Sequence, residues 1–289
     1  MTLLPWIRLR AGLHLAKIHW QRWAAAPDRR RRRHQLFRLG AAPGSDEAAL
    51  DPAALDTTGF SLARLDARLT RNLLEAWRLR VAEVDCSGLA SDRRSTGKIF
   101  FREWLDDEAL ARHPAFLEMA LATPVLSSIA RTMRQVPHLE SVDILESLPD
   151  TGAPVASQLW HYDVNDERIV KLFVYLEDCG PDNGPFTFID ATPSQRVSSA
   201  VGHYVPDARI SAQVPVDMWR TVEGPTGTGF LIDTGRCYHF GSRCTRRRVA
   251  YIATYSSGLK FMPRARLWPG LLQGLALNPL QRAVCDMAD

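Results

Sequence analysis

Six short segments in the second half of the chain limit what this sequence can fold into. They are rich in β-branched and aromatic residues and are bounded by Gly, Pro, Asn and Asp: HLESVDILESLP, SQLWHYDV, IVKLFVYLED, PFTFID, GFLIDT and RVAYIATYS. Segments of this length and composition are typical of β-strands. Because no helical pattern separates them, they predict an antiparallel sandwich or jelly roll. The Asn-Gly pair in the turn CGPDNGP indicates a hairpin between the third and fourth segments.

The first half of the chain has a different pattern, which predicts helices. From Phe60 to Arg80, leucines and Trp77 recur at helical spacing, as on a helix that faces a core. Asp106–Val136 shows a second helical pattern. The stretch 41–58 is rich in Ala, Pro and Asp, which favours a linker or loop. Leucines from 267 to 277 predict a C-terminal helix that packs on the body.

Basic residues are concentrated at the start of the chain. Residues 1–40 hold ten Lys and Arg against one acid, Asp28, so this leader carries +9 while the remaining 249 residues carry −5. A mildly acidic body argues against nucleic-acid binding over the main surface. The run Arg29–Arg33 has two interpretations: contact with an anionic membrane or nucleic acid, or a solvated helix start with Asp28 as its cap.

Cysteine usage and hydropathy bear on the compartment. The five cysteines, Cys86, Cys179, Cys237, Cys244 and Cys285, include no CxxC pair, which disfavours zinc ribbons and thioredoxin-like motifs. No apolar run reaches the roughly 18–20 residues that a spanning helix needs. Arg8, Arg10 and Lys17 interrupt the apolar stretch that a signal peptide would have. We therefore expect a cytoplasmic protein without a transmembrane segment.

One set of residues in the β-rich half carries the chemistry. His161 and Asp163 lie two apart on an expected strand, so their side chains share one face. His239 follows GFLIDT and a short turn, and Arg248 begins the next strand nine residues later. Two His and one carboxylate on one face form the facial triad that suits ferrous iron and oxygen chemistry. Arg248 offers a planar fork for a second carboxylate several Å from the metal.

Alternatives exist for two of these positions. His203 could replace His239 as third ligand, but no arginine follows it on a strand. Arg246 and Arg247 compete with Arg248. Arg248 is favoured because positions 248, 250 and 252 share a face if the strand starts there, whereas a slip of one residue would move the assignment.

The chain resembles the phytanoyl-CoA dioxygenase family of iron(II)/2-oxoglutarate oxygenases. The residues that carry the resemblance are LWHYDVND…KLFVYLEDCGPDNGPF…GTGFLIDTGRCYHFGS…RRRVAYIATY, and it covers roughly residues 140–258. The resemblance implies a double-stranded β-helix (jelly roll, cupin-like). It implies that His161, Asp163 and His239 bind Fe(2+) and that Arg248 binds the distal carboxylate of 2-oxoglutarate, with O2 as the second co-substrate.

The sequence departs from the family pattern at two places. ATPSQ stands where relatives often have a PGSH-like turn, which weakens any analogy about substrate. Ala250 stands where some relatives have a hydroxyl residue after the co-substrate arginine, so Thr187, Tyr175 or Lys171 could complete the co-substrate site. Asp163 keeps its carboxylate, which disfavours halogenation.

These patterns also divide the chain. We expect a basic helical leader and linker over 1–58 and a single catalytic domain over 59–289. Within the domain we expect helical support over 59–137, a double-stranded β-helix core over 138–260 and a C-terminal helix over 262–289.

The implied activity is oxidation, by preference hydroxylation, of an unactivated C–H bond in a small molecule, with succinate and CO2 as co-products. The basic leader is compatible with an anionic or lipid-like substrate and with peripheral membrane contact. Two other functions remain open: a non-catalytic jelly-roll binding module, and a cupin-like metalloenzyme that does not use 2-oxoglutarate.

Overall fold

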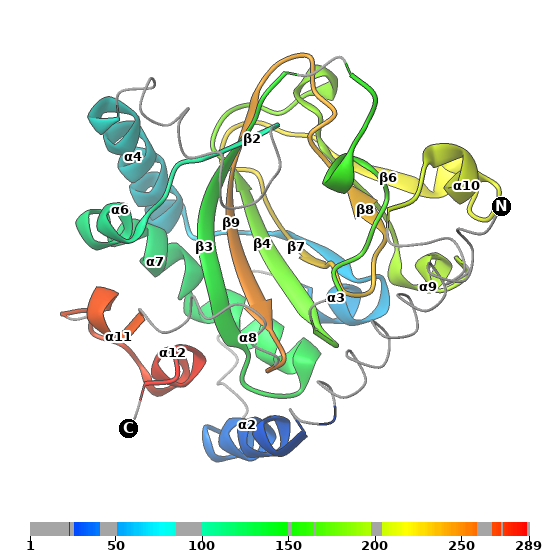
Figure 1. The fold of residues 1–289 in the computed structure, drawn as a ribbon. Helices are drawn as coiled ribbons and strands as arrows, with labels where there is room; N and C mark the ends of the chain where they lie inside the picture. Colours follow the sequence, from blue (N-terminus) through cyan, green and yellow to red (C-terminus); the bar gives the residue numbers. More distant parts are fainter. Residues whose placement is uncertain are drawn as a thin grey trace, which may run out of the picture.

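Two antiparallel β-sheets form the centre of the molecule (Figure 1). The computed structural model describes residue 23 and residues 26–40, 51–84, 100–149, 152–164, 166–197, 204–258, 268–272 and 274–287. The larger sheet has six strands in the order β1-β7-β4-β9-β3-β2, and the smaller has three in the order β6-β5-β8. The strands are β1 (Phe60–Ala63), β2 (Phe101–Glu103), β3 (His138–Ser147), β4 (Ile169–Tyr175), β5 (Phe186–Ile189), β6 (Trp219–Val222), β7 (Gly229–Asp233), β8 (His239–Phe240) and β9 (Arg248–Ser256).

Helices lie mainly on the face of the large sheet that is turned away from the small one (Figure 1). The helices are α2 (Ala26–Arg38), α3 (Pro52–Thr57), α4 (Ala67–Glu83), α6 (Asp107–Arg112), α7 (Ala115–Ala120), α8 (Thr123–Met133), α9 (Ala191–Ser194), α10 (Asp207–Ser211), α11 (Trp268–Leu271) and α12 (Pro279–Val284). None of the helices in the described part of the chain has the length and apolar character needed to cross a bilayer.

Strand alternation divides the apolar residues into two cores. Leu172 and Tyr251 belong to the cluster that β4 and β9 share with helices α4, α7, α8 and α12. Their neighbours Phe173, Ala250 and Ile252 face the other way, into an aromatic cluster between the two sheets. Because both faces of the large sheet are covered, β4 and β9 are almost continuously apolar in sequence.

The Asn183-Gly184 turn does not form the predicted hairpin. It joins β4 of the large sheet to β5 of the small one, so the strands on either side are not paired with each other. Gly184 has φ 61°, and a Cβ there would lie 2.8 Å from the backbone of Arg243. The turn chemistry was identified, but the chain uses it to pass between sheets.

The helical predictions need four corrections. Residues 60–63 form strand β1, which pairs with β7, and the helix begins only at Ala67, after the N-cap Asp66. The expected linker contains α3. The second helical pattern is divided among α6, α7 and α8, with Pro114 and Pro124 at the starts of α7 and α8. The described part of the C-terminal region holds two short helices, α11 and α12.

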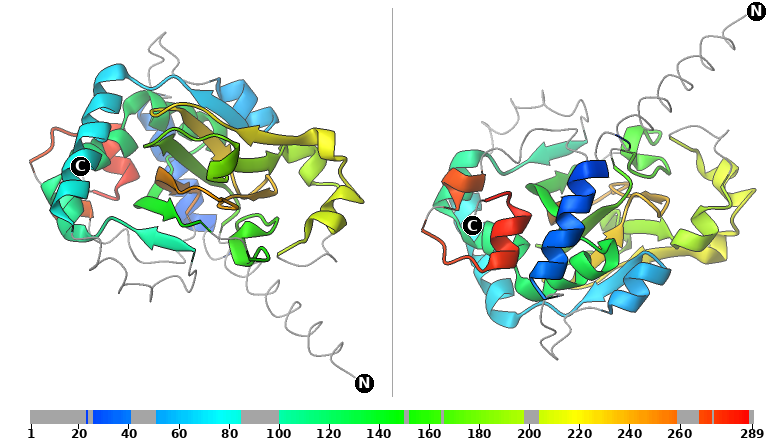
Figure 2. Two further views of the ribbon diagram at one scale, coloured as in Figure 1. Left: turned by 90° about the horizontal axis from the view of Figure 1, so that it is seen from above. Right: turned by 90° about the horizontal axis from the view of Figure 1, so that it is seen from below.

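One arginine of the basic run is part of the core. Arg32 is 1% exposed, donates a hydrogen bond of 3.0 Å to the carbonyl of Pro137 and forms ion pairs with Asp286 and Asp28. His138 lies between the same two carboxylates, 2.9 Å from Asp28 and 3.1 Å from Asp286. The cluster therefore fastens α2 to β3 and α12, which lie side by side (Figure 2).

The remaining predictions for the leader are settled only in part. Asp28 lies in the first turn of α2, where it pairs with Arg31, rather than at the N-cap position. Arg30, Arg31 and Arg33 are exposed, as a solvated helix requires. Residues 1–22 lie outside the described residues.

Candidate metal centre

Backbone hydrogen bonds bring the two predicted histidine ligands together. His161 and His239 form an isolated antiparallel bridge, with N–H···O distances of 3.0 and 2.8 Å. The amide of Asp163 donates to the carbonyl of Thr234 at 2.8 Å. The sequence predicted a strand around His161, but the structure has only an isolated bridge there. This segment runs beside the β7–β8 connection.

The three predicted ligands meet at one point. His161, Asp163 and His239 each offer a ligand atom, and these atoms all lie within 4.8 Å of one another. The imidazole centroids are 4.3 Å apart. Both histidines are buried, and Asp163 is partly buried. The geometric condition for a facial triad is met.

Each imidazole is oriented by a backbone carbonyl. Nδ1 of His161 lies 2.9 Å from the carbonyl oxygen of Leu159, and Nδ1 of His239 lies 3.0 Å from that of Cys237. Since a carbonyl only accepts, Nδ1 carries the proton in both rings, and Nε2 keeps the lone pair that a metal requires. Such contacts are the usual means by which metal-binding histidines are held in one tautomer.

Burial keeps His161 in its neutral form. Desolvation, reinforced by the neighbouring His239, holds the pKa of His161 well below its ordinary value of 6.5. Phe186 stacks on His239 at 5.3 Å, and Tyr204, which is 40% exposed, lies 5.5 Å from His161. Of these two aromatic neighbours of the histidines, Phe186 is buried and Tyr204 is partly exposed to solvent.

Lys171 lies beside the carboxylate of the site. Its Nζ is 2.7 Å from Oδ2 of Asp163. Burial alone would raise the pKa of Asp163, but the Lys171 ammonium, followed by the two histidines, outweighs it and lowers the pKa. Side chains two residues apart on a strand share one face, so Lys171 lies on the same face of β4 as Phe173 and Tyr175. That face is turned toward the inter-sheet space.

Arg248 lies inside the same sandwich. It is 5% exposed, and its Nη atoms donate to the carbonyl of Gly184 at 2.6 Å and to the hydroxyls of Ser242 and Ser147 at 3.0 and 3.3 Å. Its buried Nε has no hydrogen-bond partner. The guanidinium is thus fixed in place with one donor still to be satisfied.

The competing arginines point elsewhere. Arg246 and Arg247 are exposed, and Arg247 pairs with Glu177 at 2.5 Å. Ala250 and Ile252 belong to the inter-sheet cluster, as the predicted register of β9 required. Of the three arginines, Arg248 is the one on the inner face.

The hydroxyl groups suggested as helpers at the co-substrate site are already bonded to the protein. The Tyr175 hydroxyl donates to the carbonyl of Val222 at 2.7 Å and accepts from the amide of Phe186 at 3.2 Å. Thr187 Oγ1 lies 3.3 Å from both the Pro185 carbonyl and Thr221 Oγ1. Both residues line the inter-sheet space but spend their hydrogen-bonding capacity locally.

Two contacts were missed by the sequence reasoning. Ser147 and Ser242 hold the Arg248 guanidinium and bond to each other at 2.8 Å. Ser147 pairs with Arg248 across β3 and β9, a register that no local pattern revealed. The alternative ligand His203 lies outside the described residues.

Comparison with known proteins gives structural likeness only. No protein-family profile and no curated protein matches the sequence. Among solved structures, the "non-heme alpha ketoglutarate dependent carbocyclase SnoK from nogalamycin biosynthesis" has TM-score 0.51 at 15% identity, covering 74% of this chain and 85% of SnoK.

The other likenesses are of the same order. The epimerase SnoN, in complex with Fe3+, alpha ketoglutarate and nogalamycin RO, has TM-score 0.50 at 16% identity over 79% of this chain and 91% of SnoN. EctD from S. alaskensis, in its apoform, has TM-score 0.50 at 18% identity over 74% and 80%. The chain has the double-stranded β-helix fold. At these identities the likeness establishes the fold, which confirms the fold class expected from the sequence.

Proposed function

We propose that this protein is an iron(II)/2-oxoglutarate-dependent oxygenase of the phytanoyl-CoA dioxygenase type. It oxidises an unactivated C–H bond of a small-molecule substrate, by preference to an alcohol. The observation that carries the proposal is the meeting of His161, Asp163 and His239 in one double-stranded β-helix with a buried, incompletely bonded Arg248.

The donor set fits ferrous iron. Two imidazoles and one carboxylate on one face leave the remaining positions for other ligands, which suits non-heme Fe(II) oxygenases better than closed structural zinc. The carbonyl contacts of Leu159 and Cys237 give both rings the tautomer that binding requires. The histidines and the aspartate are therefore proposed as the metal ligands.

Arg248 fits the distal carboxylate of 2-oxoglutarate. A buried cationic donor without a partner is costly, and a carboxylate in the inter-sheet space would satisfy it by a charge-assisted hydrogen bond. The Gly184, Ser147 and Ser242 contacts hold the guanidinium against rotation. Tyr175 and Thr187 are proposed to shape this part of the site through their packing.

Lys171 is proposed to act through Asp163. Its ammonium contacts Oδ2 of Asp163, which would be one of the residues that hold the metal. The lysine thereby holds the ligand in one orientation and keeps it ionised. The role at the co-substrate that the sequence suggested for Lys171 stays a prediction.

Iron with 2-oxoglutarate and O2 supplies a strong oxidant for C–H bonds, with succinate and CO2 as co-products. The chain contributes the orientation of its ligands and an aromatic surrounding that excludes water. Phe186 and the inter-sheet phenylalanines perform the second task. The partly exposed Tyr204 beside His161 marks the side from which we propose that substrate enters. The positive charge of the basic leader, residues 1–40, favours an anionic or lipid-like substrate.

Two other functions make different predictions. A non-catalytic jelly-roll module has no need of imidazoles that are oriented by backbone carbonyls. A cupin-like metalloenzyme without 2-oxoglutarate leaves the buried Nε of Arg248 unused. The incomplete bonding of Arg248 is the feature that favours the oxygenase over both.

The test combines metal content with turnover. Protein purified without oxygen should bind one Fe(II) and release succinate from 2-oxoglutarate in a screen of small-molecule substrates. His161→Ala and Asp163→Ala should abolish both properties while the protein stays folded. Matched controls are His34→Ala and Asp107→Ala, which change exposed residues of the same types.

Two results would contradict the proposal. Undiminished iron binding in either ligand variant would refute the ligand assignment. Bound iron together with failure of 2-oxoglutarate to bind the iron-loaded protein would favour the cupin-like function.

A further inference from the structure

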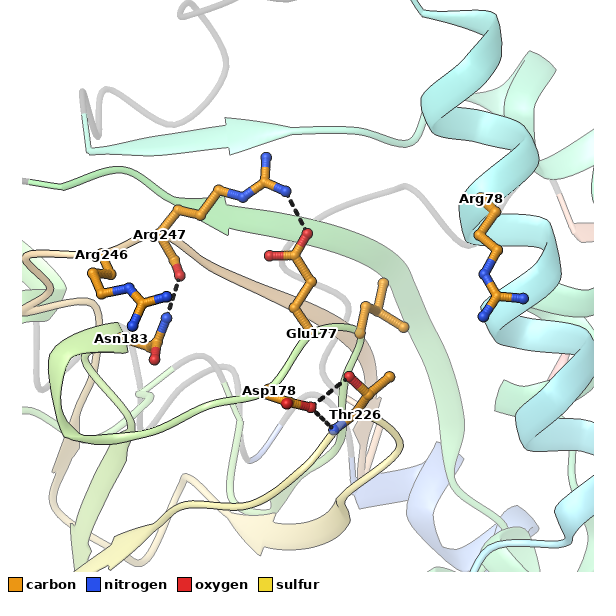
Figure 3. A pocket seen from close by; sticks show the side chains of 8 residues that line it. Arg78, Glu177, Asp178, Asn183, Thr226, Arg246 and Arg247 are labelled. Atoms are coloured by element: carbon orange, nitrogen blue, oxygen red, sulfur yellow. Dashed lines mark hydrogen bonds and ion pairs between the residues drawn. The ribbon is translucent and has the colours of Figure 1, made fainter.

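A cavity lies outside the proposed catalytic site, between α4 and the loops that precede β5, β7 and β9 (Figure 3). Its volume is 510 Å³, within the range of small-molecule sites. The lining residues are Arg78, Leu176, Glu177, Asp178, Asn183, Thr226, Arg246 and Arg247. Three guanidinium groups and two carboxylates therefore face one space.

The acidic groups of this cavity are already bonded within the protein. Asp178 accepts from the backbone amide and the hydroxyl of Thr226, both at 2.8 Å, and these bonds lower its pKa. Glu177 pairs with Arg247 at 2.5 Å. Arg247 also lies 3.7 Å from the buried Glu146, so its charge is met from two sides.

The polar amide of the cavity is satisfied as well. Asn183 donates to the carbonyl of Arg247 at 2.7 Å and accepts from the amide of Gly180 at 3.0 Å (Figure 3). The amide of Asn183 is therefore engaged through both its nitrogen and its oxygen.

Two guanidinium groups remain available. Arg246 makes no side-chain hydrogen bond or ion pair with any residue that the structure describes. Arg78, on the opposite wall, has only an exposed contact of 3.3 Å with Glu75, a type of pair that contributes little and is readily exchanged (Figure 3). Two of the three guanidinium groups that line the cavity are thus available to a ligand, and they come from two sides.

We propose that this cavity binds the phosphate group of a small organic anion. Guanidinium groups bind phosphate through paired, charge-assisted hydrogen bonds. A doubly charged group matches two arginines on facing walls better than a single carboxylate does. The site is independent of the proposed metal centre, because none of its lining residues is a proposed ligand of iron or 2-oxoglutarate.

The cavity is nevertheless close in the chain to Arg248. Asn183 and Arg247 are bonded to each other at its edge, and their neighbours Gly184 and Arg248 are bonded by a hydrogen bond of 2.6 Å. A ligand that draws on Arg246 therefore binds beside the two segments that hold the co-substrate arginine.

The experiment titrates the full-length chain with inorganic pyrophosphate by calorimetry at physiological ionic strength. We expect saturable binding, weakened about tenfold or more by Arg246→Gln and by a smaller factor by Arg78→Gln. Arg71→Gln is the matched control, because Arg71 is exposed on α4 two turns earlier and does not line the cavity.

Three outcomes would overturn the proposal. They are no saturable binding in the millimolar range, an unchanged affinity in Arg246→Gln, or an equal loss in Arg71→Gln. The last result would mean that only the general surface charge attracts the anion. Because the measurement needs neither iron nor turnover, its failure would leave the proposed oxygenase function untouched, and the converse also holds.

Discussion

Replacing Arg248 by lysine separates the positive charge of this residue from its planar geometry. Lysine keeps the charge but presents a compact ammonium in place of a fork of five donors. In the native protein the fork already makes three bonds, to Gly184, Ser147 and Ser242, and its Nε is still unpaired. An ammonium cannot hold the same three acceptors and also present a donor to a carboxylate in a fixed direction.

The expected magnitude follows from those bonds. Loss of one charge-assisted hydrogen bond to 2-oxoglutarate costs about 1.5–3 kcal/mol, which raises its Kd by roughly 10- to 150-fold. Buried acceptors that lose their donor cost about 1–3 kcal/mol in the free energy of unfolding. Both binding and stability should therefore decrease, and the decrease in binding should be the more specific effect.

The assay is anaerobic calorimetry of 2-oxoglutarate binding to the metal-loaded protein, accompanied by urea denaturation. Arg247→Lys is the matched variant, because its side chain is 54% exposed and pairs with Glu177 at the surface. We expect it to change 2-oxoglutarate binding little and stability by less than about 1 kcal/mol. Unchanged 2-oxoglutarate affinity in Arg248→Lys, or a larger loss in Arg247→Lys, would refute the assignment.

Three further predictions concern charges at other positions. Lys171→Met should raise the lowest pH at which the protein still binds metal, because the ammonium is the main group that keeps Asp163 ionised. Lys171→Arg keeps the charge and should leave that pH unchanged. Equal values for the two variants in a metal titration against pH would contradict this. Arg32→Met should lower the free energy of unfolding by about 3–5 kcal/mol and Arg31→Met by less than about 1, because Arg32 is 1% exposed and Arg31 lies at the surface; equal losses in urea would show that Arg32 is not a buried anchor. Burial acts to raise the pKa of Asp28, but His138 and Arg31 outweigh it and lower the pKa. The ionised carboxylate therefore stabilises the fold at neutral pH, and this contribution is lost progressively as the pH falls below about 4. Asp28→Asn should reduce the loss of stability in that range, and an unchanged acid transition would contradict the argument.

Local pattern in the sequence was sufficient to predict which of the candidate residues share a face. The two-residue spacing of His161 and Asp163 predicted a shared face, and the structure places their ligand atoms together with that of His239. The positions 248, 250 and 252 predicted the inner face of β9, which the packing of Ala250 and Ile252 confirms. In both cases a period of two residues carries the information.

The errors have a different origin, since each depends on a partner far away in the chain. Phe60–Ala63 is a strand because β7 supplies an edge to pair with, although its leucine continues a helical pattern. The Asn183-Gly184 turn connects two sheets, which turn chemistry alone does not reveal. Arg32 is buried because carboxylates from α2 and from the region after α12 surround it, and one arginine in a run of five looks like the others.

The bridge between His161 and His239 bears on how the protein would acquire the proposed metal ion. Two peptide hydrogen bonds, of 3.0 and 2.8 Å, join the backbone at these two positions. Because these bonds do not involve the imidazoles, we expect that a chelator will remove the proposed metal without unfolding the chain. Bound metal would then link two segments that are distant in the sequence, and the melting temperature should rise with the concentration of free metal.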